Sequence, residues 1–237
     1  MSYNFESIEK FNNSLKEIKF LIGKIKDSEF NVFEGNIYLK SALLLLVGKF
    51  EIFLEESIQD FIQNINNLNL SNEKIPQVLK VNHISNLMTE KKIIDKMNND
   101  CKYDDICQDF TELTELFVPQ NSFLIKISIK FNYGKHGSKE IEKLFRRIGI
   151  IGIFDEIEIF DYKDSYLDGT EKTKIEFKET IDGVTNIRNN ILHQDANIST
   201  TSLDLSAYCK YFEQFSFKLI GKLEEKLDGI AGNLQIL

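Results

Sequence analysis

The chain of 237 residues contains no tryptophan, only two prolines and only twelve glycines. Proline and glycine interrupt helices and mark tight turns, so their scarcity favours long helices over many short strands. Hydrophobic residues make up 42% of the chain and charged residues 28%, a balance typical of globular domains. The sequence therefore predicts one helical domain of above-average size with a substantial core.

Cysteine is also scarce. Cys101, Cys107 and Cys209 are odd in number and form no Cys-x-x-Cys motif, so the sequence predicts neither a disulfide framework nor a zinc site, and it suits a reducing compartment. The longest apolar run, Ser41–Val47, is too short to cross a bilayer. The first nine residues lack the apolar segment of a signal peptide. We expect a cytoplasmic protein with no membrane association, metal or cofactor.

Positive charge is in deficit, since 29 Lys and Arg face 37 Asp and Glu for a net charge of −8. Non-specific nucleic-acid binders usually carry a basic surface, because neutralising phosphates drives their affinity. The charge therefore argues against a protein that coats DNA. It remains compatible with a ribonuclease that contacts a few nucleotides in a local basic cleft.

Apolar periodicity predicts the long helices. Steps of three and four residues run through 5–25 and, most strongly, through 37–68, with 27–36 as a polar connection. The apolar positions of the second segment are Leu43, Val47, Phe50, Leu54, Ile58, Phe61 and Ile65. We divide the chain into an N-terminal helix, 1–36, that packs on a helical bundle, 37–237. An insertion at about 70–174 interrupts the bundle.

The second half of the chain has fewer clear signals. The segment 123–131 alternates like a strand but has no evident partner strand, so we expect a helix. Ser138 resembles the N-cap of a short helix, and 161–174 resembles a polar surface loop. A helix is expected over 175–193. Thr201-x-x-Asp204 resembles a capping box that opens the last helix.

Arg188 falls on the apolar face of the helix over 175–193, with Ile181 and Val184 before it and Ile191 after it. A guanidinium keeps its charge there and needs an anionic partner or a wet cleft. His193 follows five residues later, about 140° further around the helix. The two side chains could flank a cleft, and a two-fold dimer could bring both copies together.

This pair suits RNA cleavage in which the 2′-OH attacks the adjacent phosphate. An imidazole such as His193 can serve as general base or general acid. Arg188 could hold the phosphate and stabilise the added charge of the transition state. Asn189 and Asn190 could orient a neighbour or the ribose. The alternative is that Arg188 pairs with a structural carboxylate, because an Arg and a His at this spacing also occur by chance.

The segment Arg188-Asn189-Asn190-Ile191-Leu192-His193 is similar to the Arg-x4-6-His signature of the HEPN superfamily. Residues 44–54, which include Phe50-Glu51-Ile52-Phe53, resemble the long helix of its bacterial RiboL-PSP-HEPN branch. The segments 136–150 and 201–219 resemble that branch's central loop with its helix and its closing helix. One departure is Gln194-Asp195 after the histidine, where the family often has glycine.

The resemblance implies an all-α, HEPN-like helical bundle with additional helices and a surface loop. It implies a homodimer with both Arg188–His193 pairs near the two-fold cleft. The implied activity is a metal-independent endoribonuclease that leaves a 2′,3′-cyclic phosphate and acts in toxin–antitoxin systems or anti-phage defence, with an antitoxin or defence protein as partner. The competing hypothesis is a catalytically inactive helical module that binds RNA, a nucleotide or a partner protein.

Glu51 lies at the flank of the long helix's apolar face, between Val47 and Leu54. A half-buried carboxylate there needs a cationic partner. In the family's arrangement this glutamate points at the motif arginine, so we expect Glu51 to orient Arg188. A glutamate at the surface edge of the helix is the alternative.

Further side chains could contact RNA. Lys135 and His136 lie in a glycine-flanked loop, although a histidine there is more often merely solvated. Arg146 and Arg147 could extend an RNA track, but cations are also favoured at a helix C-terminus. Two other groups have simpler interpretations. The aromatic residues of the last helix have the spacing of a core stripe: Tyr208, Tyr211, Phe212 and Phe215. The acidic residues before it are typical of a solvated face: Asp155, Glu156, Glu158 and Asp161.

Overall fold

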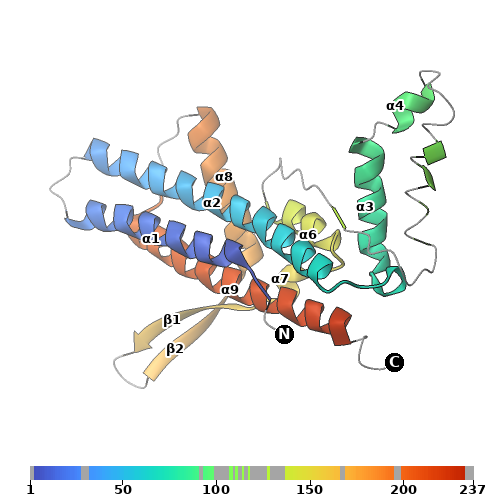
Figure 1. Ribbon diagram of the computed structural model, residues 1–237. Helices are drawn as coiled ribbons and strands as arrows, with labels where there is room; N and C mark the ends of the chain where they lie inside the picture. The colour runs from blue at the N-terminus through green and yellow to red at the C-terminus, as the bar shows by residue number, and fades with distance from the viewer. Residues whose placement is uncertain are drawn as a thin grey trace.

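The computed structural model describes residues 3–27, 32–90, 93–98, 107–108, 110–111, 114, 117, 127–128, 137–165, 169–194 and 199–232. These residues form a helical bundle with one two-stranded hairpin, which confirms the all-α fold class. Figure 1 shows three long helices, α1 (Glu6–Asp27), α2 (Val32–Asn67) and α9 (Ser202–Gly232), packed side by side with α8 (Phe177–Gln194) crossing α2.

The core between these helices is rich in phenylalanine. Phe50 of α2 lies at its centre, with its ring centroid 4.6 Å from that of Phe212 and 5.9 Å from that of Phe215, both on α9. The same ring contacts Phe11 of α1 and Phe177 of α8 at centroid distances of 5.8 and 6.4 Å. One aromatic cluster therefore joins the four longest helices that the structure describes.

The long helices follow the predicted periodicity, because the apolar positions expected on α2 are all buried. The predicted connection over 27–36 is wrong in its second half, since α2 begins at Val32. Phe33 in its first turn is 73% exposed, so this turn has no buried stripe that would have marked it as helix.

The segment between α2 and the hairpin contains several short helices. They are the 3-10 helix η1 (Asn72–Lys74), α3 (Gln77–Glu90), α4 (Ile93–Asn98), α6 (Ser138–Arg146) and α7 (Ile153–Glu156). In Figure 1, α3 and α4 stand away from the bundle, whereas α6 and α7 lie against it. Of the predicted helix over 123–131, only Ile127 and Ser128 are described. The division at residue 36 and the insertion at about 70–174 remain predictions.

The expected surface loop over 161–174 is wrong. An antiparallel hairpin forms instead from β1 (Ile159–Ser165) and β2 (Gly169–Ile175), and it pairs Ile159 with Ile175. Ile159 is buried in the core and Ile175 packs against it, whereas Tyr162 is exposed. Because the hairpin rests on α9, tertiary contacts stabilise two strands that would be marginal alone.

The prediction that Ser138 is the N-cap of α6 is wrong. Gly137 occupies that position with a φ of 122°, and Ser138 is the first helical residue. The backbone N–H and the hydroxyl of Ser138 both donate to the Asp182 carboxylate of α8 at 2.8 Å. A Cβ at position 137 would lie 3.2 Å from Asp182 Oδ1, so glycine permits both the backbone angle and the close approach.

The capping box at α9 is confirmed. The Asp204 N–H donates to Thr201 Oγ1 at 3.2 Å, and Asp204 Oδ2 accepts from both the N–H and the hydroxyl of Thr201 at 2.8 Å. The hydrogen bonds from Thr201 lower the pKa of the Asp204 carboxyl below its ordinary value of 3.8.

We expect Thr201→Val to reduce the free energy of unfolding by about 1 kcal/mol at pH 7. A depressed carboxyl pKa contributes stability above the ordinary value, and this contribution is lost as pH falls through the folded pKa. The difference in free energy of unfolding between wild type and variant should therefore shrink at pH values below the folded pKa of Asp204. Urea denaturation at several pH values measures it. Thr89→Val, at an exposed position within α3, should show no such pH dependence, and a gap that is constant with pH would contradict the prediction.

Candidate active site

The candidate catalytic segment occupies the last two turns of α8. This helix forms because Ile181, Val184 and Ile191 follow one face and are buried in the core. The C-terminal end of α8 extends past α2 in Figure 1. The segment is thus anchored on the bundle through its apolar face and reaches the surface at its end.

Arg188 is half-buried between the turns of Val184 and Ile191, as its place on the apolar face predicted. Its Nη1 donates a hydrogen bond of 3.0 Å to Asn189 Oδ1 of the same helix. A guanidinium has five N–H donors in a planar fork. The bond to Asn189 uses one of these donors and fixes the orientation of the side chain.

His193, in contrast to the half-buried Arg188, is exposed in the last turn of α8. Asn190 is also exposed. The rotation of about 140° between positions 188 and 193 explains why one side chain is half-buried and the other exposed. The two residues are therefore neighbours along the axis, on different sides of the same helix end. Leu192, next to His193, is also 51% exposed.

Glu51 is half-buried on α2, and its Oε1 atom is fully buried. Phe50, the residue before it, contacts Phe177 at the start of α8. Glu51 therefore lies on the helix that α8 crosses, although this ring contact is at the start of α8 and Arg188 lies near its other end. The hydrogen bond given above for Arg188 goes to Asn189, so the pairing of Glu51 with Arg188 remains a proposal.

The four candidate RNA contacts have different environments. Lys135 and His136 lie outside the described residues. Arg146 is exposed at the end of α6. Arg147 is half-buried and binds Asn82 of α3: its Nε donates to Asn82 Oδ1 at 3.3 Å, and Asn82 Nδ2 donates to its carbonyl at 2.9 Å. Burial lowers the pKa of Arg147, so this arginine has at least a structural role.

Sequence reasoning missed the contribution of Asp182. It lies six residues before Arg188 and receives both hydrogen bonds from the N-terminus of α6, where a carboxylate also interacts favourably with the helix dipole. α8 is thereby tied to α6 on one side and to α2 on the other. No local signal reveals this contact, since the two residues are 44 positions apart.

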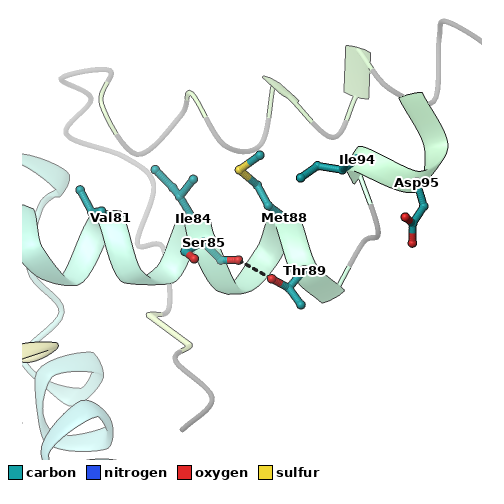
Figure 2. A pocket seen from close by; sticks show the side chains of 7 residues that line it. All are labelled: Val81, Ile84, Ser85, Met88, Thr89, Ile94 and Asp95. Atoms are coloured by element: carbon teal, nitrogen blue, oxygen red, sulfur yellow. Dashed lines mark hydrogen bonds between the residues drawn. The ribbon is translucent and has the colours of Figure 1, made fainter. Parts of the chain in front are cut away.

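Figure 2 shows an apolar groove that does not involve the motif. It has a volume of about 580 Å³ and lies between α3 and α4, lined by Val81, Ile84, Met88 and Ile94 together with polar side chains. These helices stand apart from α8 in Figure 1. The groove is therefore no part of the Arg188–His193 site.

The core stripe on α9 is confirmed: Tyr211, Phe212 and Phe215 are buried, and Tyr208 packs half-buried against them. The solvated acidic face holds for Asp155, Glu156 and Glu158, which are exposed, but not for Asp161, which is half-buried and accepts a hydrogen bond from Tyr211. Within the described ranges, no three His, Cys, Asp or Glu residues gather as metal ligands would. Among those same residues, no helix combines the length and the apolar character that crossing a membrane requires.

A helical bundle with an arginine and a histidine five positions apart near the exposed end of a core helix is the arrangement that a HEPN-type domain would have. The model of the RiboL-PSP-HEPN family matches residues 9–227, so the chain belongs to this family. The matched region begins within α1 and ends within α9. Comparisons with curated proteins and with solved structures found no match.

Proposed function

We propose that this protein is an endoribonuclease that cleaves RNA without a metal ion, with Arg188 and His193 as its catalytic residues. The observation that carries the proposal is the motif at the end of α8 in a RiboL-PSP-HEPN chain. Arg188 is held by the bundle, and His193 is open to solvent. A half-buried cation and an accessible imidazole at the same helix end suit phosphodiester chemistry.

In the proposed reaction, the ribose 2′-oxygen attacks the adjacent phosphorus and the bond from phosphorus to the 5′-oxygen breaks. The products are a 2′,3′-cyclic phosphate and a 5′-hydroxyl. His193 removes the proton from the 2′-OH or donates one to the leaving oxygen. Arg188 holds the non-bridging oxygens and stabilises the charge that they gain in the transition state.

Three neighbours would support these two residues. Asn189 holds the guanidinium of Arg188 through its Oδ1, and the exposed Asn190 is available to a ribose. Glu51, with its buried oxygen on the crossing helix, would orient Arg188 from the other side. A guanidinium between two such groups loses little freedom when it binds phosphate.

The direct test is incubation of the purified protein with a mixed panel of RNAs in EDTA. Cleavage that leaves cyclic phosphate ends supports the proposal. Intact RNA in the presence of correctly folded protein favours the second candidate, an inactive module that binds RNA, a nucleotide or a protein, which the net charge of −8 also favours. Severe toxicity on expression, relieved by His193→Ala, would point to a toxin or defence effector with a neutralising partner protein.

We also propose that the protein acts as a homodimer. Phe33, Ile37, Leu45 and Ile52 of α2 are exposed, as is Leu192 beside the motif. Exposed apolar residues that gather on one side of a helix favour an interface. Docking of a second copy there would bring two Arg188–His193 pairs to one cleft.

Introducing charge into this surface should break the dimer. Ile52 is 50% exposed, so Ile52→Lys is expected to leave the monomer folded while preventing apolar contact with a second copy. Light scattering after size exclusion measures the mass. Val81→Lys is the matched control, because Val81 is similarly exposed at 52% on α3. A dimer that persists in Ile52→Lys would contradict this interface.

A further inference from the structure

The hairpin is held in a fixed orientation by α9. Gln214 Nε2 donates to the Phe160 carbonyl at 2.8 Å, and the Phe160 N–H donates to Gln214 Oε1 at 3.2 Å. One turn further along α9, Lys218 Nζ donates to the Glu158 carbonyl at 2.6 Å. Figure 1 shows the two strands projecting from this anchor away from the bundle. The hairpin is therefore both positioned and accessible.

One face of the hairpin combines aromatic rings with lysines. Phe160 and Tyr162 alternate along β1, and their cross-strand partners in β2 are Lys174 and Lys172. The two rings lie 6.4 Å apart between centroids. Lys172 Nζ lies 3.6 Å from the Phe160 centroid, and Lys218 Nζ of α9 lies 5.5 Å from it. We call these five residues the hairpin face.

Core packing does not explain this face. Tyr162 is 54% exposed, and Lys172, Lys174 and Lys218 are exposed as well. Among the side chains that the structure describes there, Glu158 pairs with Lys174 at 3.1 Å. In a chain of net charge −8, three lysines beside two rings form a local cationic surface that is complementary to phosphate.

We propose that the hairpin face binds a single-stranded segment of RNA, with a base stacked on Tyr162 and the phosphates beside Lys172 and Lys218. Aromatic residues interleaved with cations bind single strands in this way. A protein strand added to the open edge is disfavoured, because β2 carries Lys172 and Lys174, and charged residues block edge pairing. The inference rests on the proposed function only in that RNA is the ligand.

The hairpin face is remote from the catalytic pair. The hairpin leads directly into α8, and the motif lies at the far end of that helix, roughly 25 Å away at 1.5 Å per residue. The hairpin would therefore anchor a part of the substrate distant from the cleaved bond. Its loss should weaken RNA binding without removing the catalytic groups.

The test is RNA binding by the full chain carrying His193→Ala, which leaves the RNA intact. Fluorescence anisotropy with a labelled single strand of roughly 20 nucleotides, longer than the ~4–16 that such sites cover, gives Kd. Tyr162→Ala should raise Kd by about tenfold or more, whereas Tyr162→Phe should stay within about twofold because it keeps the ring. Lys172→Gln should reduce the salt dependence by about one phosphate contact.

Lys143→Gln serves as the control, since Lys143 is an exposed lysine of α6 paired with Glu140. It should leave Kd and its salt dependence unchanged. RNA binding that is equal in wild type, Tyr162→Ala and Lys172→Gln would overturn the inference, as would no binding at all. The separate cleavage assay keeps the two proposals distinct. If Tyr162→Ala weakens RNA binding but the wild type does not cleave RNA, the nuclease proposal is rejected and RNA binding by the hairpin face is supported.

Discussion

Replacing His193 with alanine is expected to reduce the rate of RNA cleavage by about 10²–10⁴-fold, the usual contribution of a general acid or base. The side chain is exposed in the last turn of α8, so its removal should leave the fold and the melting temperature unchanged. Single-turnover cleavage in EDTA measures the chemical step. Retention of wild-type cleavage in this variant would exclude His193 from the reaction.

Arg188→Ala should also abolish most of the cleavage activity, because it removes the group that stabilises the charge developing in the transition state. Arg188→Lys should recover only part of it, since lysine keeps the charge without the planar fork. Asn186→Ala, at an exposed position of the same helix, is the control and should cleave normally. If Glu51 orients Arg188, Glu51→Gln should lower activity; unchanged activity and melting temperature together would reject that role.

The second large effect concerns stability. Phe50→Ala is expected to reduce the free energy of unfolding by about 3–5 kcal/mol, because Phe50 is 3% exposed and touches rings from α1, α8 and α9. A domain has a total stability of about 5–15 kcal/mol, so the variant should be close to unfolding at 37 °C. Urea denaturation followed by circular dichroism gives the value.

The control for Phe50 is Phe217→Ala. Phe217 is also a phenylalanine of a long helix, but its side chain on α9 is 76% exposed. Surface substitutions of this kind usually change stability by less than about 0.5 kcal/mol. Equal losses in the two variants would show that the aromatic cluster around Phe50 does not hold the bundle together.

The fold was predictable where burial repeats with the period of a helix. The stripe from Leu43 to Ile65 identified α2, and Thr201 with Asp204 marked the start of α9, because both signals are local. The hairpin was missed because Ile159 and Ile175 are a single apolar pair at its base. Beyond this pair, the sequence of the two strands is mostly polar and charged, a composition that is also typical of loops.

The candidate site was likewise predictable where its features depend on local helical spacing. Helical spacing placed Arg188 on the packed side and His193 away from it, and the burial of each side chain agrees. The tie between Asp182 and Ser138 was not predictable, since it depends on how α6 approaches α8. The aromatic residues of the last helix were predicted to form a core stripe, and Phe212 and Phe215 are core residues. The exposed ring of Tyr162 on the hairpin was not predicted as part of a site, because the hairpin itself was not predicted.

The packing of α9 against α1 has a consequence for synthesis on the ribosome. The last helix described contacts α1 through the ion pair Lys19–Glu213 and contacts the residues before α1 through the hydrogen bond from Tyr3 to Asp228, both at 2.8 Å. It also supplies Phe212 to the ring of Phe50. At about 5–20 residues per second, roughly ten to thirty seconds separate the emergence of α2 from that of α9. A nascent or prematurely terminated chain therefore lacks a closed core on which α8 could hold Arg188 and His193 in place.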